Sequence, residues 1–167
     1  LGVRKSATGT DLIRLTKIAE TQSPPLADII YITNKTSFNL YAETLLRHLS
    51  ADGTAEGGIK NITLFLSTEG VSADGLKMFD GSGLSRANTV TTRGLTELLA
   101  LAAKKPYFKE LYASLPIAGD HNDMGRMKTF GEGTPLAKNA RVKTGYQEGV
   151  KSFSGYMKDR GGRLVAF

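Results

Sequence analysis

Two short strings in this sequence hold side chains suited to acyl transfer from a carboxylate-bearing donor: Ser37-Phe38-Asn39 and Lys143-Thr144-Gly145. In the second string, the lysine supplies positive potential, the threonine hydroxyl can bond a carboxylate, and the glycine lets a ligand lie against the backbone. In the first, the Ser37 hydroxyl can relay a proton towards a leaving group while the Asn39 amide holds a backbone carbonyl. These residue types favour chemistry through a covalent acyl intermediate on a serine.

The known signature that combines two such strings also contains a nucleophilic serine with a lysine three residues after it, and that pair is missing here. No lysine in the chain has a serine three positions before it. The two strings that are present differ in weight. From average residue usage, Lys-Thr-Gly arises by chance in about a few of every hundred chains of this length, and Ser-x-Asn in roughly a third to a half of them. Taken alone, Ser37 is more typical of a serine that caps a helix.

Three other groups of residues are weaker candidates for chemistry. Asp80-Gly81-Ser82-Gly83 lacks the glycine spacing of a nucleophile elbow or a dinucleotide fingerprint, and it is typical of a tight turn. Asp120-His121-Asn122-Asp123 offers one histidine and two carboxylates to a metal, but such a set is more typical of a solvated loop. We expect His48 to cap a helix end or to face solvent. Neither histidine has the partners of a Ser-His-Asp hydrolase.

The composition favours one ordinary globular domain, since 167 residues, 40% hydrophobic and 23% charged, are enough to form a core. The net charge of +6 is spread along the chain without a basic run, so no nucleic-acid partner is expected. The longest apolar run, 98–103, is too short to span a membrane. Because the chain has no cysteine, it offers no disulfide, thiolate nucleophile or thiolate metal ligand.

Apolar spacing and turn residues place the two strings on expected elements. Helices are expected over 25–35 after a cap at Ser23, over 39–49, from 91 or 92 to 104 or 105, and over 107–114. The apolar stretch 59–66 fits a helix or a strand, and its spacing favours a helix. We expect a glycine-rich surface loop over 51–58 and a short strand over 77–79. Further strands are expected over 11–18, 140–143, 153–158 and 163–167. Ser37 and Asn39 would then lie at a break between two helices, and Lys143 at the end of a strand.

The surroundings of both strings resemble one family, the low-molecular-mass class C penicillin-binding proteins, which are D-alanyl-D-alanine carboxypeptidases and endopeptidases of peptidoglycan. The resemblance covers about 23–167 in the family's order, through the segments SPPLADII at 23–30, KTSFNLYAETLLR at 35–47, DGSGLSR at 80–86, LPIAG at 115–119, GTPL at 133–136 and RVKTG at 141–145. In that family the Ser-x-x-Lys string lies near the start of the mature protein. The chain therefore resembles the C-terminal portion, and 1–22 is expected to lead in from a missing N-terminal part.

The resemblance implies an α/β fold, with 1–167 as a single, partial transpeptidase or β-lactamase-like domain whose largely antiparallel sheet is flanked by helices. It implies Ser37, Asn39 and Lys143 as catalytic residues. It also implies Thr144, Gly145 and Tyr146 as substrate-binding residues, with the backbone N–H of Tyr146 as one of two oxyanion donors. Serine or threonine is usual where Tyr146 stands, so a short hydroxyl near the substrate carboxylate is replaced by a phenol. No metal or organic cofactor is implied.

The resemblance also implies that the whole protein hydrolyses D-Ala-D-Ala bonds or cross-links of peptidoglycan in the periplasm, or elsewhere outside the cytoplasmic membrane. Its partners would be peptidoglycan peptide stems and β-lactams, and this chain alone would not be acylated. Two alternatives stay open: a non-catalytic relative that binds peptidoglycan or a partner protein and, less favoured, a serine β-lactamase. The resemblance further implies that the C-terminal helix that packs on the final strand in this family is also lacking. Without its first and last pieces the sheet would have exposed edges, so we also expect pairing with another chain or aggregation.

Overall fold

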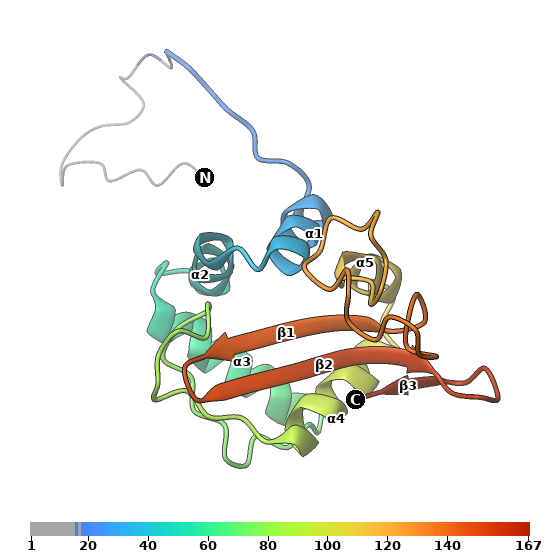
Figure 1. Cartoon of the computed structure of the whole chain (residues 1–167). Coiled ribbons are helices and arrows are strands. Elements are labelled where there is room, and N and C mark those ends of the chain that lie inside the picture. The colour runs from blue at the N-terminus through green and yellow to red at the C-terminus, as the bar shows by residue number, and fades with distance from the viewer. Residues whose placement is uncertain (1–15, 17) are drawn as a thin grey trace.

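The computed structural model describes residue 16 and residues 18–167, which form a helical layer and one antiparallel sheet (Figure 1). The predicted strand over 11–18 falls largely outside the described residues. The order of elements is α1 (Leu26–Thr36), α2 (Asn39–His48), α3 (Ala55–Thr68), α4 (Thr92–Ala102), α5 (Phe108–Ser114), β1 (Arg141–Gln147), β2 (Val150–Lys158) and β3 (Leu164–Ala166). The strands are ordered β1-β2-β3, each antiparallel to the next. The predicted antiparallel sheet flanked by helices is therefore confirmed.

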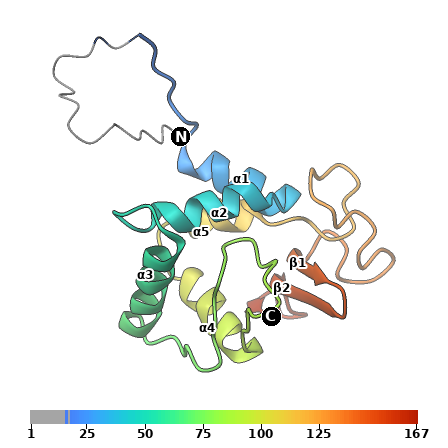
Figure 2. The same cartoon turned by 90° about the vertical axis from the view of Figure 1, so that its left-hand side faces the viewer.

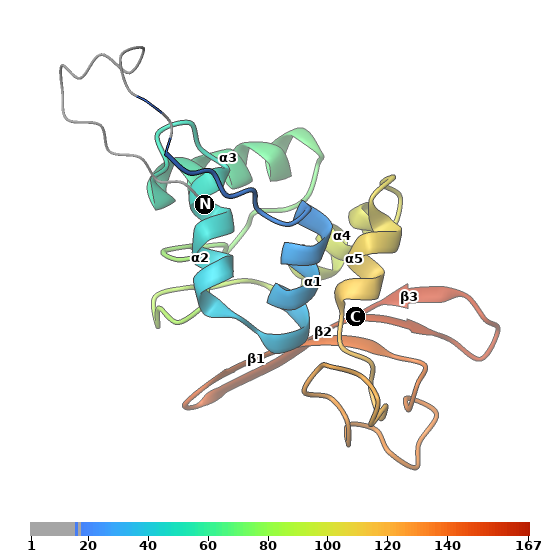
Figure 3. The ribbon, with the colours of Figure 1, turned by 90° about the horizontal axis from the view of Figure 1, so that it is seen from above.

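The helices lie against one face of the sheet, as the view from above shows (Figure 3). Tyr156 of β2 fixes this contact, because its buried ring packs edge-on against Phe108 of α5 at 5.1 Å between ring centroids. Its hydroxyl donates a hydrogen bond to the carbonyl of Leu99 in α4 at 2.8 Å. Burial raises the pKa of Tyr156 to about 12, so the phenol stays protonated and keeps this hydrogen bond.

The opposite face of the sheet is partly covered by the long segment between α5 and β1. Its core is a small apolar cluster in which Val142 of β1 packs with Ala118, Met127 and Ala140. Residues 116–118 also run antiparallel beside the start of β1, since the N–H of Val142 donates to the carbonyl of Pro116 at 2.8 Å. The outer edge of β1 is thus covered at its beginning and uncovered from Lys143 onwards.

The predicted helices are confirmed, but only some of the residues that cap their N-terminal ends were predicted correctly. Thr91 caps α4 as predicted, accepting the N–H of Gly94 at 3.1 Å. Thr54 caps α3 in the same way, so this helix begins at Ala55 inside the stretch predicted to be a loop. Ser23 is not the cap of α1. That helix follows Pro25, whose carbonyl accepts the N–H groups of residues 28 and 29, with no side-chain cap bond.

The hairpin formed by β1 and β2 is longer than predicted. Both strands extend through polar residues as far as a turn at Glu148 and Gly149, where Gly149 adopts a φ of 81° that suits glycine. Lys143 is consequently the third residue of β1 and not its last, so the prediction of a strand end there was wrong. The expected strand over 77–79 is reduced to a single bridge between Lys77 and Thr89, with two hydrogen bonds of 2.9 Å.

Among residues 16 and 18–167, no helix combines the length and apolar character that crossing a membrane requires.

The outer edge of β3 leads to a prediction about association. Val165 is 37% exposed on this three-residue strand, and an uncovered strand edge is a template for pairing with another chain. We expect light scattering to detect dimers or larger species of the 167-residue chain, and Val165→Lys to reduce them by placing a charge on the edge. A matched Val150→Lys change, at the exposed hairpin end of β2, should have no effect. A monodisperse monomer of the unmodified chain would contradict the prediction.

Candidate active site

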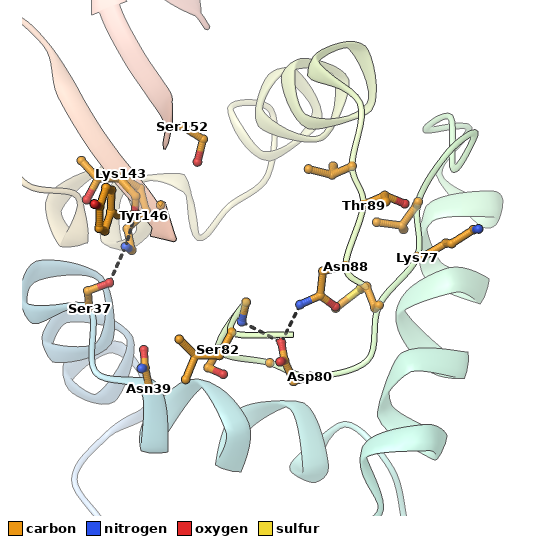
Figure 4. Close-up of a pocket in the computed structure, with 18 of the residues that line it drawn as sticks. Ser37, Asn39, Lys77, Asp80, Ser82, Asn88, Thr89, Lys143, Tyr146 and Ser152 are labelled. Carbon is orange, nitrogen blue, oxygen red and sulfur yellow. Dashed lines mark hydrogen bonds between the residues drawn. The ribbon is translucent and has the colours of Figure 1, made fainter. Parts of the chain in front are cut away.

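A cleft of about 620 Å³ opens where the junction of α1 and α2 approaches β1 (Figure 4). The α1–α2 junction contributes Ser37 and Asn39, and β1 contributes the segment from Lys143 to Tyr146. The opposite rim is formed by the segment between α3 and α4, which lies between α2 and the sheet (Figure 2). The cleft therefore brings together both strings that the sequence singled out, although 106 positions separate Ser37 from Lys143.

Ser37 lies at the left-handed end of α1, with φ 57° and ψ 50°. Its N–H and that of Phe38 both donate to the carbonyl of Thr33, which closes the last turn of α1 before α2 begins at Asn39. This turn explains why the chain breaks here and why the exposed hydroxyl of Ser37 reaches the cleft. A residue other than glycine in this conformation costs about 1 kcal/mol.

The side chain of Lys143 joins the two strings directly. Its Nζ donates to the hydroxyl oxygen of Ser37 at 2.8 Å and to the carbonyl oxygen of Thr144 at 2.6 Å. An ammonium group has three N–H donors, so one is left for a ligand. Burial lowers the pKa of Lys143 below that of an ordinary lysine, and the positive charge of Arg126 lowers it further.

The backbone of β1 presents hydrogen-bonding groups to the cleft. In an antiparallel pair, backbone groups point alternately towards the partner strand and away from it. The N–H of Val142 points away from β2, since it donates to Pro116, and the same alternation turns the N–H groups of Thr144 and Tyr146 to the outer edge. The edge is uncovered at these positions. A backbone donor of Tyr146 therefore faces the cleft despite the large side chain at this position.

Two further residues of the strings leave room for a ligand. A Cβ added to Gly145 would lie 2.5 Å from the hydroxyl oxygen of Ser152 on β2, so a side chain there would crowd this part of the cleft. Asn39 is the first residue of α2 and is exposed. Its side-chain amide makes no hydrogen bond to the part of the chain that the structure describes, so it can bind a ligand carbonyl.

The rim opposite β1 contains the tight turn that was predicted for Asp80-Gly81-Ser82-Gly83. Two carboxylates bind its backbone. Asp80 accepts the N–H groups of Gly83 at 2.7 Å and Ser85 at 2.6 Å. Glu43 of α2 accepts the N–H groups of Gly81 at 3.1 Å and Ser82 at 2.9 Å. Burial by itself would raise the pKa of Glu43, but these hydrogen bonds lower it below its usual value. The turn is therefore fixed to the same helix that begins at Asn39.

A buried ion pair that was not predicted from the sequence lies beneath this site. Lys35, two residues before Ser37, donates to Asp123 Oδ1 at 2.5 Å and to the carbonyl of Leu115 at 2.8 Å. The Lys35 and Asp123 side chains are only 1% and 5% exposed. The other carboxylate oxygen, Oδ2, accepts the N–H groups of Ile117 and Gly125. The pair therefore ties the end of α1 to the segment that leads into β1.

No single residue type signalled this pair in advance. A lysine in the last turn of a helix is usually a surface residue that balances the helix dipole. Asp123 was interpreted as part of a solvated loop with His121. His121 is exposed, 3.3 Å from Glu132, but Asp123 is buried. His48 is exposed at the end of α2 and contacts the carbonyl of Thr44 at 2.9 Å, as expected.

Comparison with known proteins gives a consistent match. The D-Ala-D-Ala carboxypeptidase 3 (S13) family matches residues 6–167. A D-alanyl-D-alanine carboxypeptidase of an Actinomadura species is 34% identical over 89% of this chain and 29% of its own length. A carboxypeptidase DacB of Mycolicibacterium smegmatis is 33% identical over 91% of this chain and 35% of its own length. The chain thus spans about a third of the length of these curated relatives.

Solved structures confirm the predicted transpeptidase-like fold. Penicillin binding protein 4 of Haemophilus influenzae, in a complex with a β-lactam, superposes with a TM-score of 0.77 at 31% identity, over 85% of this chain and 34% of that one. A predatory endopeptidase of Bdellovibrio bacteriovorus gives a TM-score of 0.61 at 20% identity, over 85% of this chain and 37% of that one, which supports the fold alone.

The buried ion pair predicts the stability of a variant. We expect Lys35→Met to lower the free energy of unfolding by about 3–5 kcal/mol at neutral pH, because Asp123 would remain buried and charged without its cation. Urea unfolding measures this loss. Lys105→Met is the matched control, since the Lys105–Glu69 pair is more than a quarter exposed on both sides, and it should cost at most about 1 kcal/mol.

Acid should reduce the difference between Lys35→Met and the unmodified chain. Burial alone would raise the pKa of Asp123, but hydrogen bonds from Lys35, Ile117 and Gly125 and the charge of Lys35 lower it below its usual value. The unmodified chain therefore loses stability as the pH falls through this lowered pKa. In the variant, protonation relieves the buried charge of Asp123, so the deficit shrinks as the pH falls through the acid range in which this carboxyl is protonated. A deficit independent of pH would contradict an electrostatic origin.

Proposed function

The chain belongs to the D-Ala-D-Ala carboxypeptidase 3 (S13) family, and on that premise we propose that it forms the substrate-binding part of a serine acyl-transfer site. The whole protein would hydrolyse the D-Ala-D-Ala bond at the end of peptidoglycan peptides, or the peptide cross-links between them. Because the 167 residues contain no Ser-x-x-Lys, the nucleophile would lie in a part of the protein outside them. The site would need no metal or organic cofactor.

The observation that carries this proposal is the 2.8 Å hydrogen bond from Lys143 Nζ to Ser37 Oγ. Because Ser37 Oγ accepts a hydrogen bond from Lys143 Nζ, its own hydroxyl proton is left to be donated into the cleft. Ser37 and Lys143, which lie 106 positions apart in the sequence, therefore meet where both can assist proton transfer to the leaving group. The uncovered edge of β1 runs beside them.

In the proposed acylation, the nucleophilic serine oxygen attacks the carbonyl carbon of the penultimate D-Ala. The C–N bond to the last residue breaks, and the serine proton passes to the leaving amine, with the Ser37 hydroxyl as the relay. The negative charge that develops on the carbonyl oxygen is stabilised by the N–H of Tyr146 and by the N–H of the nucleophile itself. Water then attacks the acyl ester and restores the free serine.

Four residues of the cleft would hold the peptide during these steps. The Asn39 amide donates to a backbone carbonyl of the substrate, and the Thr144 hydroxyl binds the carboxylate beside the scissile bond. Gly145 lets the peptide lie against β1, where the outward backbone groups can extend the sheet by one strand. Lys143 supplies the positive charge that orients the carboxylate.

Substrate and location follow from the family as proposals. The partners would be peptidoglycan peptide stems and β-lactams, which enter as mimics of the acyl donor. The protein would act outside the cytoplasmic membrane, in the periplasm or at the cell wall, where its substrate is found.

Intact-mass measurement after exposure to a penicillin tests the proposal. We expect one covalent adduct per molecule on the full-length protein, at the serine of a Ser-x-x-Lys string, and no adduct on the 167-residue chain. A full-length protein without such a string and without an adduct would instead support a non-catalytic relative. Rapid release of the adduct, with turnover of a chromogenic cephalosporin, would favour a serine β-lactamase.

A second test concerns the charge of Lys143. In the full-length protein, Lys143→Met should slow acylation by about 100-fold, because the relay and the carboxylate lose their cation. For the unmodified protein, kcat/KM should fall as the pH rises through the pKa of Lys143, which burial and Arg126 place below 10.5. Lys143→Arg should move this alkaline fall to higher pH, because arginine keeps its charge.

The control for this test is Lys158→Met, at the far end of β2. Lys158 is exposed and does not line the cleft, so acylation should keep its rate and its pH profile. An alkaline fall that is the same in Lys143→Arg and in the unmodified protein would show that another group titrates.

A further inference from the structure

Arg126 is a cation at the cleft that the proposed mechanism has not used. It lies in the segment before β1, is exposed, and lines the cleft together with Lys143 and Thr144. Two other surface arginines have carboxylate partners: Arg86 pairs with Glu148 at 3.3 Å and Arg163 with Asp159 at 2.8 Å. Within residues 16 and 18–167, Arg126 makes no ion pair. Its guanidinium is therefore available to a ligand.

The backbone that carries Arg126 is fixed on both sides. The N–H of Gly125 donates to Asp123 Oδ2 at 2.8 Å, and Asp123 is held by the buried ion pair with Lys35. On the other side, Met127 is buried in the cluster with Val142, and its carbonyl accepts the N–H of Gly119 at 2.9 Å. Arg126 thus extends from a rigid base, as a residue that positions a ligand requires.

The charge around Arg126 favours an anion in the cleft. Arg126 and Lys143 are close enough for the arginine to lower the pKa of the lysine, which means that the two cations repel each other. Among the described residues, no carboxylate contributes to the shift in the pKa of Lys143, so none offsets this repulsion. An anionic ligand would do so, and a guanidinium presents paired N–H donors that match a carboxylate.

Tyr146 leaves a place beside Thr144 that the Arg126 guanidinium can fill. The position after Lys-Thr-Gly here holds a phenol that is 78% exposed, so it offers no short hydroxyl beside Thr144. Tyr146 and Thr144 point to the same face of β1, because side chains alternate along a strand. Arg126 borders a second hollow on that face, lined also by Thr144 and Tyr146. The guanidinium can therefore reach the place where the hydroxyl is missing.

We propose that Arg126 is a specificity-determining residue that binds, together with Lys143 and Thr144, the carboxylate beside the scissile bond of the acyl donor. This inference rests on the proposed function, since it names the group of the substrate that the site selects. It requires that donors with a free carboxylate be preferred to the same donors with that group neutralised, and that Arg126 supply most of this preference.

The test compares two substrates of the full-length protein: an N-acylated peptide ending in D-Ala-D-Ala, and the same peptide with a C-terminal amide. For Arg126→Gln, kcat/KM on the acid should fall by about 10- to 100-fold, the value of a charge-assisted hydrogen bond, while kcat/KM on the amide stays nearly unchanged. Arg126→Lys should recover part of the preference for the acid. Lys128→Gln, two residues away on the same segment and not lining the cleft, is the matched control and should keep the full preference.

Two results would overturn the inference: an acid preference that survives Arg126→Gln, or equal losses on acid and amide, which would show a general structural effect. If the unmodified protein neither cleaves the peptides nor is acylated by a penicillin, the proposed function has failed and equilibrium binding of the same two peptides decides. Tighter binding of the acid that disappears in Arg126→Gln and partly returns in Arg126→Lys would still support Arg126 as the carboxylate-binding residue. Equal binding of acid and amide by the unmodified protein would reject it.

Discussion

The buried pair of Lys35 and Asp123 is the contact on which both sides of the cleft depend. Lys35 fixes the last turn of α1, and therefore the place where the chain breaks at Ser37. Asp123 fixes the segment before β1, and therefore the base of Arg126 and the approach to Lys143. A buried ion pair is seldom worth much as a source of stability, because desolvation offsets most of the attraction between its charges. The pair matters here for geometry, since it holds the end of α1 and the segment before β1 in fixed positions relative to each other.

The second constraint is the incomplete cover of β1. Residues 116–118 form hydrogen bonds with the outer edge of the strand at Val142 and then turn away, so that no strand of the described part of the chain pairs with the backbone groups that follow. An open edge is a hazard for a soluble protein, yet here it coincides with the Lys-Thr-Gly string. An extended peptide could bind along this edge of β1 through backbone hydrogen bonds, as an added strand. Fold and site use one set of donors and acceptors.

The elements that carry the site were largely predictable from the sequence, because α1 and α2 have clear helical spacing of apolar residues and the motif order resembles one family. The length of the β1–β2 hairpin could not be predicted, because its outer part is polar and its strands are paired there by backbone hydrogen bonds, which leave no apolar pattern in the sequence. The start of α3 was missed because Gly57 and Gly58 weaken a helix locally. Gly58 is there for tertiary reasons, since a Cβ would lie 2.1 Å from the carbonyl oxygen of Leu46. Contacts between residues 88 positions apart, such as Lys35 with Asp123, leave no local pattern to find.

The left-handed backbone at Ser37 has a consequence for how this position changes over generations. Glycine or asparagine would suit that conformation better than serine, so selection for folding alone pushes the position away from a hydroxyl. Under the proposed function, selection for chemistry at the cleft would hold serine there. A lineage that had given up catalysis but kept the domain as a binding module would drift to glycine or asparagine at 37. If Ser37 has the proposed role, the residue found at this one position would indicate whether a relative still uses the site.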